Sequence, residues 1–340
     1  MLNTSCSDNE DYTQPQTQDP IDDNPTDDDP MGFESLVNFN LSEVPYQNFS
    51  EYNFFQGALA SLNPQEDVIP YDLQTPLFSD YAKKDRFLWM PVDVSASYVS
   101  DTEILNFPNG TVLIKNFSYD NVQPSGDKKI IETRVMYKLN GNWEFAEYVW
   151  NDAQTEAVLD LDGSFQDITW LDDEGMSRTV NYRVPSGGEC FTCHKKNDQP
   201  FPIGVRPQNI NKLYAYEDGM MNQLQRFQNQ GFLDNYPGSI DTVVRWDDES
   251  ADLTERVRSY IDINCAHCHA EDSHCDYRPM RFAYEETVID DNLGICVEPD
   301  ESIGSAFTHI INSGSASRSV LFERIQTTDE AIRMPLLGRS

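Results

Sequence analysis

The chain has 340 residues, which is enough for two or three ordinary domains of roughly 100–200 residues each. With 58 Asp and Glu against 24 Lys and Arg, its formal net charge is −34, and this balance excludes a nucleic-acid binder because phosphate would be repelled. Hydrophobic residues make up 39%, and no apolar stretch approaches the ~20 residues of a spanning helix, so a polytopic membrane protein is excluded as well. The acidic surface predicts a protein partner with a basic docking face.

The chain begins with MLNTSC, in which one cysteine follows Leu and small polar residues. This pattern is similar to the end of a bacterial lipoprotein signal, so we expect Cys6 to be acylated and the rest of the signal to precede the given start. The SDNED that follows is similar to the acidic export tag of some surface lipoproteins. We therefore expect an exported protein, periplasmic or on the outer membrane or cell surface, that meets the membrane only through a lipid anchor.

An acidic segment follows the cysteine. Residues 1–82 contain 16 Asp and Glu and no Lys or Arg, and residues 7–30 consist mainly of Asp, Pro, Thr, Gln and Asn. Such a composition cannot bury enough apolar surface to offset the entropy lost on ordering. We interpret residues 1–35 as a lipoprotein signal remnant followed by a disordered acidic tether.

Residues 36–184 are predicted to form a β-rich domain that begins with a short helix over Ser50–Leu62. Ser50 is a suitable N-cap, apolar residues follow at helical spacing, and Pro64 ends the pattern. Six short segments rich in β-branched and aromatic residues come next, with turn signals such as Asn140-Gly141 and Asp162-Gly163 between them. Strands at this spacing predict an antiparallel sandwich or barrel. The segments are 110–119, 129–139, 143–151, 155–161, 165–170 and 177–184.

The β-rich domain carries no predicted catalytic cluster. Its acids Glu144, Glu147 and Asp152 alternate with aromatic residues, as they would on a solvated strand face. We expect all three side chains to be exposed.

Two pentapeptides after this domain share the pattern Cys-x-x-Cys-His, the attachment motif of c-type haem. Two thiols one helical turn apart each add to a vinyl group on the porphyrin edge, and the adjacent His ligates the iron. A zinc site would not need the His that follows both motifs, and a thioredoxin-like motif would need a βαβ context that the flanks lack. We predict two covalent haems, attached through Cys190, Cys193, Cys265 and Cys268, with His194 and His269 as proximal iron ligands.

Two further cysteines lie in the polar segment after the second motif. An exported protein would be expected to oxidise Cys275 and Cys296, which predicts a disulfide between them. Two buried free thiols are the alternative.

The second haem has a clear candidate for its sixth ligand. Met334 stands beside a proline after a predicted amphipathic helix over 317–325, and small cytochromes place a thioether ligand on such a loop. The residues before the motif predict another helix, whose apolar face would pack on the porphyrin edge. That face contains Leu253, Val257, Tyr260 and Ile261.

The first haem has no equally good candidate. Met220 and Met221, in a predicted helix over 217–230, and His309 are possible distal ligands, with His267 and His274 as further spare imidazoles. Methionine within a helix is more often a core residue. Haem 1 is therefore Met-ligated, bis-His or open.

Several segments together resemble an uncharacterised family of exported dihaem c-type cytochromes. They include VIPYDLQTPLFSDYAKKDRFLWMP, PNGTVLIKNF, ETRVMY, ECFTCH with PIGVRPQNIN, INCAHCH and RMPLLGR, and the likeness spans roughly residues 45–340. It implies a β-rich module followed by two haem modules, with the attachment residues named above. It implies no substrate.

The predicted fold class is thus α+β. The β-rich domain at 36–184 is followed by two mostly α-helical cytochrome c-type haem domains, at 185–248 and 249–340. Cytochrome domains usually add a last helix after the Met loop, so we expect the second domain to lack its C-terminal helix and the chain to be a fragment.

These features predict a dihaem c-type cytochrome that transfers single electrons in the bacterial cell envelope, with a redox protein as its partner. The alternative is a dihaem enzyme of peroxidase or oxidase type, which an open haem 1 would allow. A third hypothesis is that residues 60–184 bind a ligand or partner on which the haems report.

Overall fold

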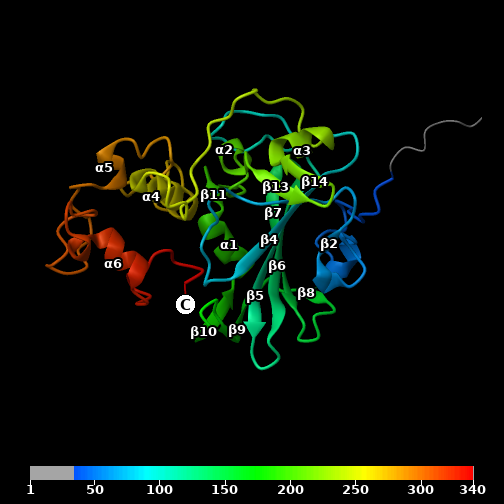
Figure 1. Ribbon diagram of the computed structural model, residues 1–340, viewed down its shortest axis with the longest axis horizontal. Coiled ribbons are helices and arrows are strands. Elements are labelled where there is room, and N and C mark those ends of the chain that lie inside the picture. The colour runs from blue at the N-terminus through cyan, green and yellow to red at the C-terminus, as the bar shows by residue number, and fades with distance from the viewer. Residues whose placement is uncertain (1–33, 340) are drawn as a thin grey trace, which may run out of the picture. The chain divides into compact units, whose positions relative to one another are not determined.

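An antiparallel sheet of eight strands forms the centre of the computed structural model, which describes residues 34–339 (Figure 1). The order of pairing is β10-β9-β5-β6-β7-β8. β4 pairs with residues 112–118 of β5, on the edge of β5 away from β6, and β3 pairs with β4. β9 pairs with β5 at Val122. The strands are β3 Ile69–Tyr71, β4 Lys83–Trp89, β5 Val112–Val122, β6 Asp127–Leu139, β7 Asn142–Trp150, β8 Ala157–Leu159, β9 Ser164–Leu171 and β10 Ser177–Val184.

All six predicted strands are confirmed, and they correspond to β5 through β10. The Asn140-Gly141 turn between β6 and β7 has positive φ at both residues, as two-residue hairpin turns of this type require. The predicted sandwich or barrel is wrong. The order of pairing ends at β8 and β10, which do not pair with each other among the described residues, so a single sheet forms without closing.

The predicted helix over Ser50–Leu62 is also wrong. Two 3₁₀ turns, η1 Phe49–Tyr52 and η2 Leu59–Ser61, flank a two-residue strand, β1 Phe55–Gln56, which pairs with β2 Asn63–Pro64. Asn48 rather than Ser50 caps η1, through a capping box with Glu51. The reason is tertiary: closely spaced aromatic side chains here enter the core of the sheet, and Asn53 turns the backbone into the left-handed region with φ of 56°.

One face of the sheet is covered by this N-terminal segment instead of by a second sheet. Phe49 and Tyr52 are fully buried, and the Tyr52 hydroxyl lies 2.9 Å from the hydroxyl of Tyr148 on β7. Burial of such large side chains stabilises the fold by roughly 1.5–3 kcal/mol each. The strand residues of this core are Phe87, Trp89, Val112, Ile114, Ile130, Val135, Tyr137, Ala146, Tyr148, Trp150 and Ala157.

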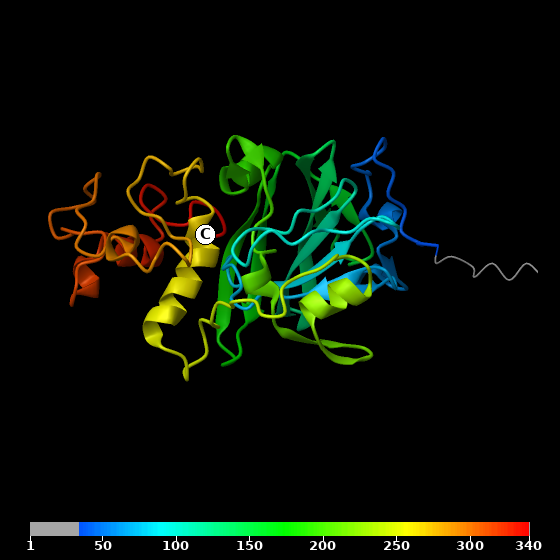
Figure 2. The same cartoon turned by 90° about the horizontal axis from the view of Figure 1, so that it is seen from above.

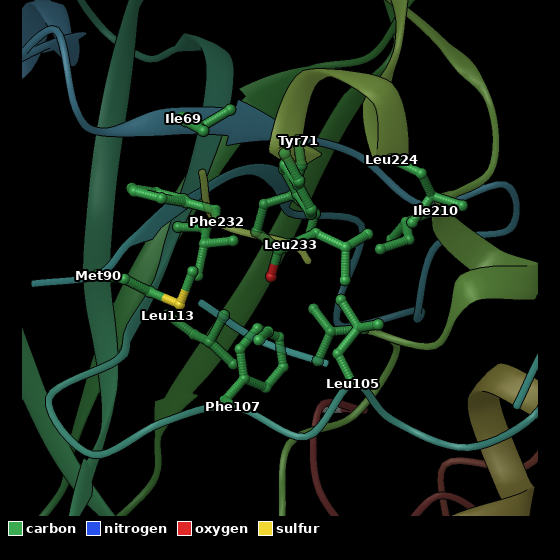
Figure 3. Close-up of a cluster of buried hydrophobic side chains, with 14 of the residues drawn as sticks. Ile69, Tyr71, Met90, Leu105, Phe107, Leu113, Ile210, Leu224, Phe232 and Leu233 are labelled. Carbon is green, nitrogen blue, oxygen red and sulfur yellow. The ribbon is translucent and has the colours of Figure 1, made fainter. Parts of the chain in front are cut away.

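The opposite face carries two apolar clusters, separated by charged residues. The register places Arg86, Lys115, Arg134 and Glu147 directly opposite one another on β4, β5, β6 and β7, and we call these four residues the charged row. One neighbouring cluster, drawn in Figure 3, joins strand residues to α2, α3 and the chain after them; it includes Ile69, Tyr71, Met90, Leu105, Phe107, Leu113, Ile210, Leu224, Phe232 and Leu233. The other includes Phe117, Tyr119, Ile131, Ile168, Trp170, Tyr182 and Val184.

The chain after β10 consists of short helices, small hairpins and loops; Figure 2 shows α4 to α6 in this part from a second side. The helix predicted before the second motif is α4, and that predicted over 317–325 is α6, so both are confirmed. The elements are α1 Gly187–Cys193, β11 Lys195–Lys196, β12 Gln199–Pro200, α2 Pro207–Ile210, β13 Leu213–Tyr216, β14 Gly219–Asn222, α3 Gln223–Asn229, α4 Leu253–Ile261, the π-helical turn η3 Asp262–Ala266, α5 Asp290–Leu293, η4 Ala316–Arg318 and α6 Val320–Gln326.

The prediction of mostly α-helical cytochrome c-type domains is wrong. The structure is mostly β: of residues 34–339, 28% lie in strands and 17% in helices. The helix predicted over 217–230 is the second half of a hairpin, β13–β14, followed by the short α3. Gly, Ser, Asp and Pro recur throughout residues 270–319, and positive φ at Asp272 and Cys296 interrupts helical backbone there.

Residues 35–339 belong to one compact unit. The predictions for residues 1–33, including acylation of Cys6 and the acidic tether, lie outside the described residues. Within residues 34–339, none of the helices combines the length and the apolar content that a membrane crossing demands.

Candidate functional site

The first Cys-x-x-Cys-His motif forms the helix α1, directly after β10. Ser186 caps the helix and accepts a hydrogen bond from the backbone of Glu189, whose carboxylate accepts from the Ser186 N–H at 2.8 Å. Arg183 on β10 binds the same carboxylate at 2.7 Å. Before the helix, Gly163 approaches so closely that a Cβ there would lie 2.7 Å from the Ser186 nitrogen. The motif is thus held rigidly against the end of the sheet.

His194 follows the end of α1, and one of its ring nitrogens is hydrogen-bonded within the protein. Its Nδ1 lies 2.8 Å from the carbonyl oxygen of Phe201, and because a carbonyl can only accept, Nδ1 carries the proton. Burial lowers the pKa of His194 to about 4, which keeps the imidazole neutral at neutral pH. A neutral imidazole with Nδ1 bound to a carbonyl leaves the Nε2 lone pair for a metal, the usual arrangement of a ligating His.

The prediction that three acids of this region are solvated is wrong for Glu147. Glu144 and Asp152 are exposed, but Glu147 is buried and its Oε1 accepts a hydrogen bond from Sγ of Cys190 at 2.7 Å. Burial raises the pKa of both Cys190 and Glu147. Residues 144 and 147 differ in parity, so they lie on opposite faces of β7, and this period-two signal could have separated them from the sequence.

Next to Glu147 lies a charged network that the sequence pattern does not predict. Arg134 lies 2.5 Å from Glu132, which is fully buried and also accepts a hydrogen bond from Tyr182 at 2.6 Å. The ammonium of Lys115 lies 4.9 Å from the centre of the Phe117 ring, and burial lowers its pKa. These residues place several charges beneath the first motif.

The second motif continues directly from α4. Asp252 caps α4 by accepting hydrogen bonds from two backbone N–H groups, and the helix then widens into the π-helical turn that contains Cys265. Arg206 binds the buried Asp262 at 3.1 Å, and Asn264 accepts from the Phe78 N–H at 2.7 Å. π-Helical turns are rare and frequent at functional sites.

A cavity of about 540 Å³ opens beside this motif and brings together several predicted residues. Cys265, Cys268, His269 and Met334 all lie in its wall. Met334 is placed there by its backbone N–H, which donates to the carbonyl oxygen of Arg324 on α6 at 2.8 Å. Burial lowers the pKa of His269 to about 4, so this imidazole is neutral as well. Apolar and aromatic side chains complete much of the wall, among them Tyr260, Met280, Phe282, Ile310, Val320, Leu321 and Ile325.

A smaller cavity, of about 70 Å³, lies beside the first motif. Its wall combines motif residues with the charged row and with the second motif. The lining residues include Cys190, Cys193, His194, Lys115, Arg134, Phe117 and His267. Cys193 and His267 also line the larger cavity, so they lie at the junction of the two.

Of the residues named as possible distal ligands of haem 1, Met220, Met221 and His309 lie elsewhere, whereas the spare imidazole His267 lines the smaller cavity. Met220 is 64% exposed on β14, and Met221 packs against the cluster drawn in Figure 3. His309 is hydrogen-bonded to Thr308 at 3.0 Å. None of these three residues, all within the described chain, lines the smaller cavity.

The predicted disulfide between Cys275 and Cys296 is not formed. Cys275 is buried in the wall of the larger cavity, held by a backbone hydrogen bond to Cys268 at 2.9 Å, whereas Cys296 is exposed. Both thiols are free, as are the four motif thiols.

The donor set fits a c-type haem at each motif. The four motif thiols form no disulfide with one another, and the two His residues that follow them, His194 half-buried and His269 buried, are both neutral. Nδ1 of His269 is buried and makes no hydrogen bond within the described part of the chain, so a partner for this ring is missing. The larger cavity lies within the roughly 300–1,000 Å³ of ordinary ligand sites, and its wall is mostly apolar. Comparison of the chain with protein-family models, with curated proteins and with solved structures found no match.

Proposed function

We propose that the protein is a dihaem c-type electron carrier of the bacterial cell envelope, with one haem attached at each Cys-x-x-Cys-His motif. When bound, haem iron would supply one-electron redox chemistry. The proposal needs no helix-rich cytochrome domain. It needs two thiols and a neutral His at each motif, and a dry cavity that the chain surrounds.

The observation that carries the proposal is the wall of the larger cavity. Cys265 and Cys268 lie in it together with His269 and Met334, although Met334 is far from the motif in sequence. His269 and Met334 would hold the iron of haem 2, a ligand pair that favours the reduced state and raises the potential. Cys190 and Cys193 would hold haem 1, with His194 as its proximal ligand.

The charge of the chain supports a docked partner. A net charge of −34 favours a partner with a basic face, and the rate of electron exchange with it should fall as salt rises. The proposed location, exported and tethered through an acylated Cys6, rests on the sequence of residues 1–11.

Mass spectrometry of protein matured in a host that attaches c-type haem tests the proposal. We expect two covalent haems in the wild type, one in C190A/C193A and one in C265A/C268A. The matched control is C296A, which removes an exposed thiol outside both motifs and should keep two. A wild-type protein without haem, or with a metal ion held by bare thiolates, would contradict the proposal.

A second candidate, a dihaem enzyme of peroxidase or oxidase type, is favoured by the positions of Met220, Met221 and His309 outside the smaller cavity. An iron open on one side would then stand beside an electron-relay haem. A high-spin ferric EPR signal that shifts on addition of cyanide or peroxide would support the enzyme. A wholly low-spin spectrum, unchanged by both, would support the carrier.

A further inference from the structure

The two motifs meet at their second cysteines. Sγ of Cys193, Sγ of Cys268 and one ring nitrogen of His267 all lie within 4.8 Å of one another. Sγ of Cys268 also lies 3.8 Å from the carbonyl oxygen of Thr192, inside the first motif. The two attachment sites, distant in sequence, therefore share an edge.

Hydrogen bonds beside both motifs hold Cys193 and Cys268 close together. Asn197, three residues after His194, donates its backbone N–H to the carbonyl oxygen of Asp272, three residues after His269, at 3.0 Å. The chain before β4 also contacts the segment of the second motif, because the Phe78 N–H donates to Oδ1 of Asn264 at 2.7 Å. Backbone groups thus fix the distance between the motifs.

The first cysteines point in different directions. Cys190 lies against Glu147 on the sheet and lines only the smaller of the two cavities, whereas Cys265 lines only the larger. Cys193 lines both cavities, and so does His267. The two cavities therefore meet at Cys193 and His267, and Cys268 lies next to both residues in the wall of the larger cavity.

We propose, on the basis of the proposed function, that the two haems form one coupled redox unit whose porphyrin edges are brought side by side by Cys193 and Cys268. In a haem thioether the sulfur is bonded to the carbon of the former vinyl group, so each sulfur lies two bonds from its ring. Two sulfurs within 4.8 Å leave no space for a layer of protein between those ring edges. Electron exchange between the haems then needs no intervening side chain, and the charge on one iron acts directly on the other.

The test compares the wild-type spectra with those of the two single-haem variants, C190A/C193A and C265A/C268A. Circular dichroism in the Soret band and ferric EPR are recorded for each, after mass spectrometry has counted the haems. We expect the wild type to differ from the sum of the single-haem spectra, with a two-signed Soret band and broadened ferric signals. A wild-type spectrum equal to that sum would overturn the inference.

A measurement on the wild type alone covers the case in which a single-haem variant does not fold. After reduction by one electron, one haem is diamagnetic low-spin iron(II), and the ferric signal of the other should sharpen. An unchanged line shape would overturn the inference. Two attached haems with additive spectra would overturn only the coupling, whereas absence of haem would overturn the proposed function itself.

Discussion

The guanidinium of Arg206 lies 3.1 Å from the carboxylate of Asp262, a side chain with no exposed surface, and this ion pair joins the segment after β12 to the turn that carries the second motif. Asp262 also accepts a hydrogen bond from the Tyr284 N–H at 3.1 Å. A carboxylate in this position depends on its cation, because water does not reach it.

We therefore expect R206M to destabilise the protein by roughly 3 kcal/mol, since it leaves a buried charge without its partner. The matched control is R245M, which removes an exposed ion pair with Asp247 and should change the free energy of unfolding by less than about 1 kcal/mol. Urea unfolding measures both values. Equal losses in the two variants would contradict the role given to Arg206.

Because of Lys84 on β4, we expect the free energy of unfolding to rise with pH at alkaline pH. Its ammonium donates to the Ala82 carbonyl at 2.7 Å, and burial lowers its pKa from 10.5 to about 7. Between these two pH values the unfolded chain holds a proton that the folded chain has lost, so the free energy of unfolding rises with pH.

K84M should reduce that rise, leaving the part that the buried Lys115 contributes, and should stabilise the protein at pH 6 by a few kcal/mol, since one pKa unit corresponds to about 1.4 kcal/mol. K128M, which removes an ammonium 3.0 Å from Asp85 in a half-exposed pair, is the control and should keep the rise. The measurement is the midpoint of urea unfolding from pH 6 to pH 10. A slope in K84M equal to that of the wild type would refute the assignment.

Because of Glu147, we expect the opposite at acid pH: the free energy of unfolding should fall as pH rises. Burial raises its pKa above the ordinary 4.5, so the folded protein keeps a proton that the unfolded chain loses as pH rises above that value. The stability that Glu147 contributes is complete below pH 4.5 and is lost as pH rises through its folded pKa.

E147Q should show a flatter dependence of unfolding free energy on pH across this window, because a neutral amide has no proton to lose. E144Q, which alters an exposed side chain of the same strand, should leave the wild-type slope in place. Urea titrations at several pH values above 4 provide the comparison. Identical slopes in E147Q and E144Q would count against a buried, protonated Glu147.

Met334 offers a prediction about potential. If its thioether ligates the second iron, M334A should lower the midpoint potential of that haem by on the order of 0.1 V or more, because loss of a Met ligand disfavours the reduced state. M176A, which alters an exposed side chain, should leave the potential unchanged. Potentiometric titration of both variants is the measurement, and a potential equal to that of the wild type in M334A would exclude this ligand.

The strands β5 to β10 could be predicted because their alternation and turns are local features of the chain. Local features failed at Ser50–Leu62, where apolar spacing indicated a helix but the aromatic side chains are needed in the core of the sheet. They failed again after β10, where two haem motifs suggested helical domains that the Gly- and Asp-rich segments do not form.

The motif residues themselves could be identified from their spacing, and so could Met334 as a neighbour of His269 in one cavity. Strand alternation could have separated Glu147 from Glu144, but its contact with Cys190 and the approach of Cys193 to Cys268 could not be predicted, because both depend on how distant segments pack together. Lys115 and Arg134 were missed for the same reason, since nothing in their local sequence marks them as lining a cavity.

The wide turn η3 Asp262–Ala266 sets the angular position of everything that follows it. An α-helix advances by roughly 100° per residue, so deleting one residue here, which would restore an ordinary helical turn, would swing His269 far around the axis and out of the cavity wall. An insertion in the loops between α5 and α6 would not rotate His269 in this way. Across related chains, length should therefore be constrained at this turn and free to vary in those loops.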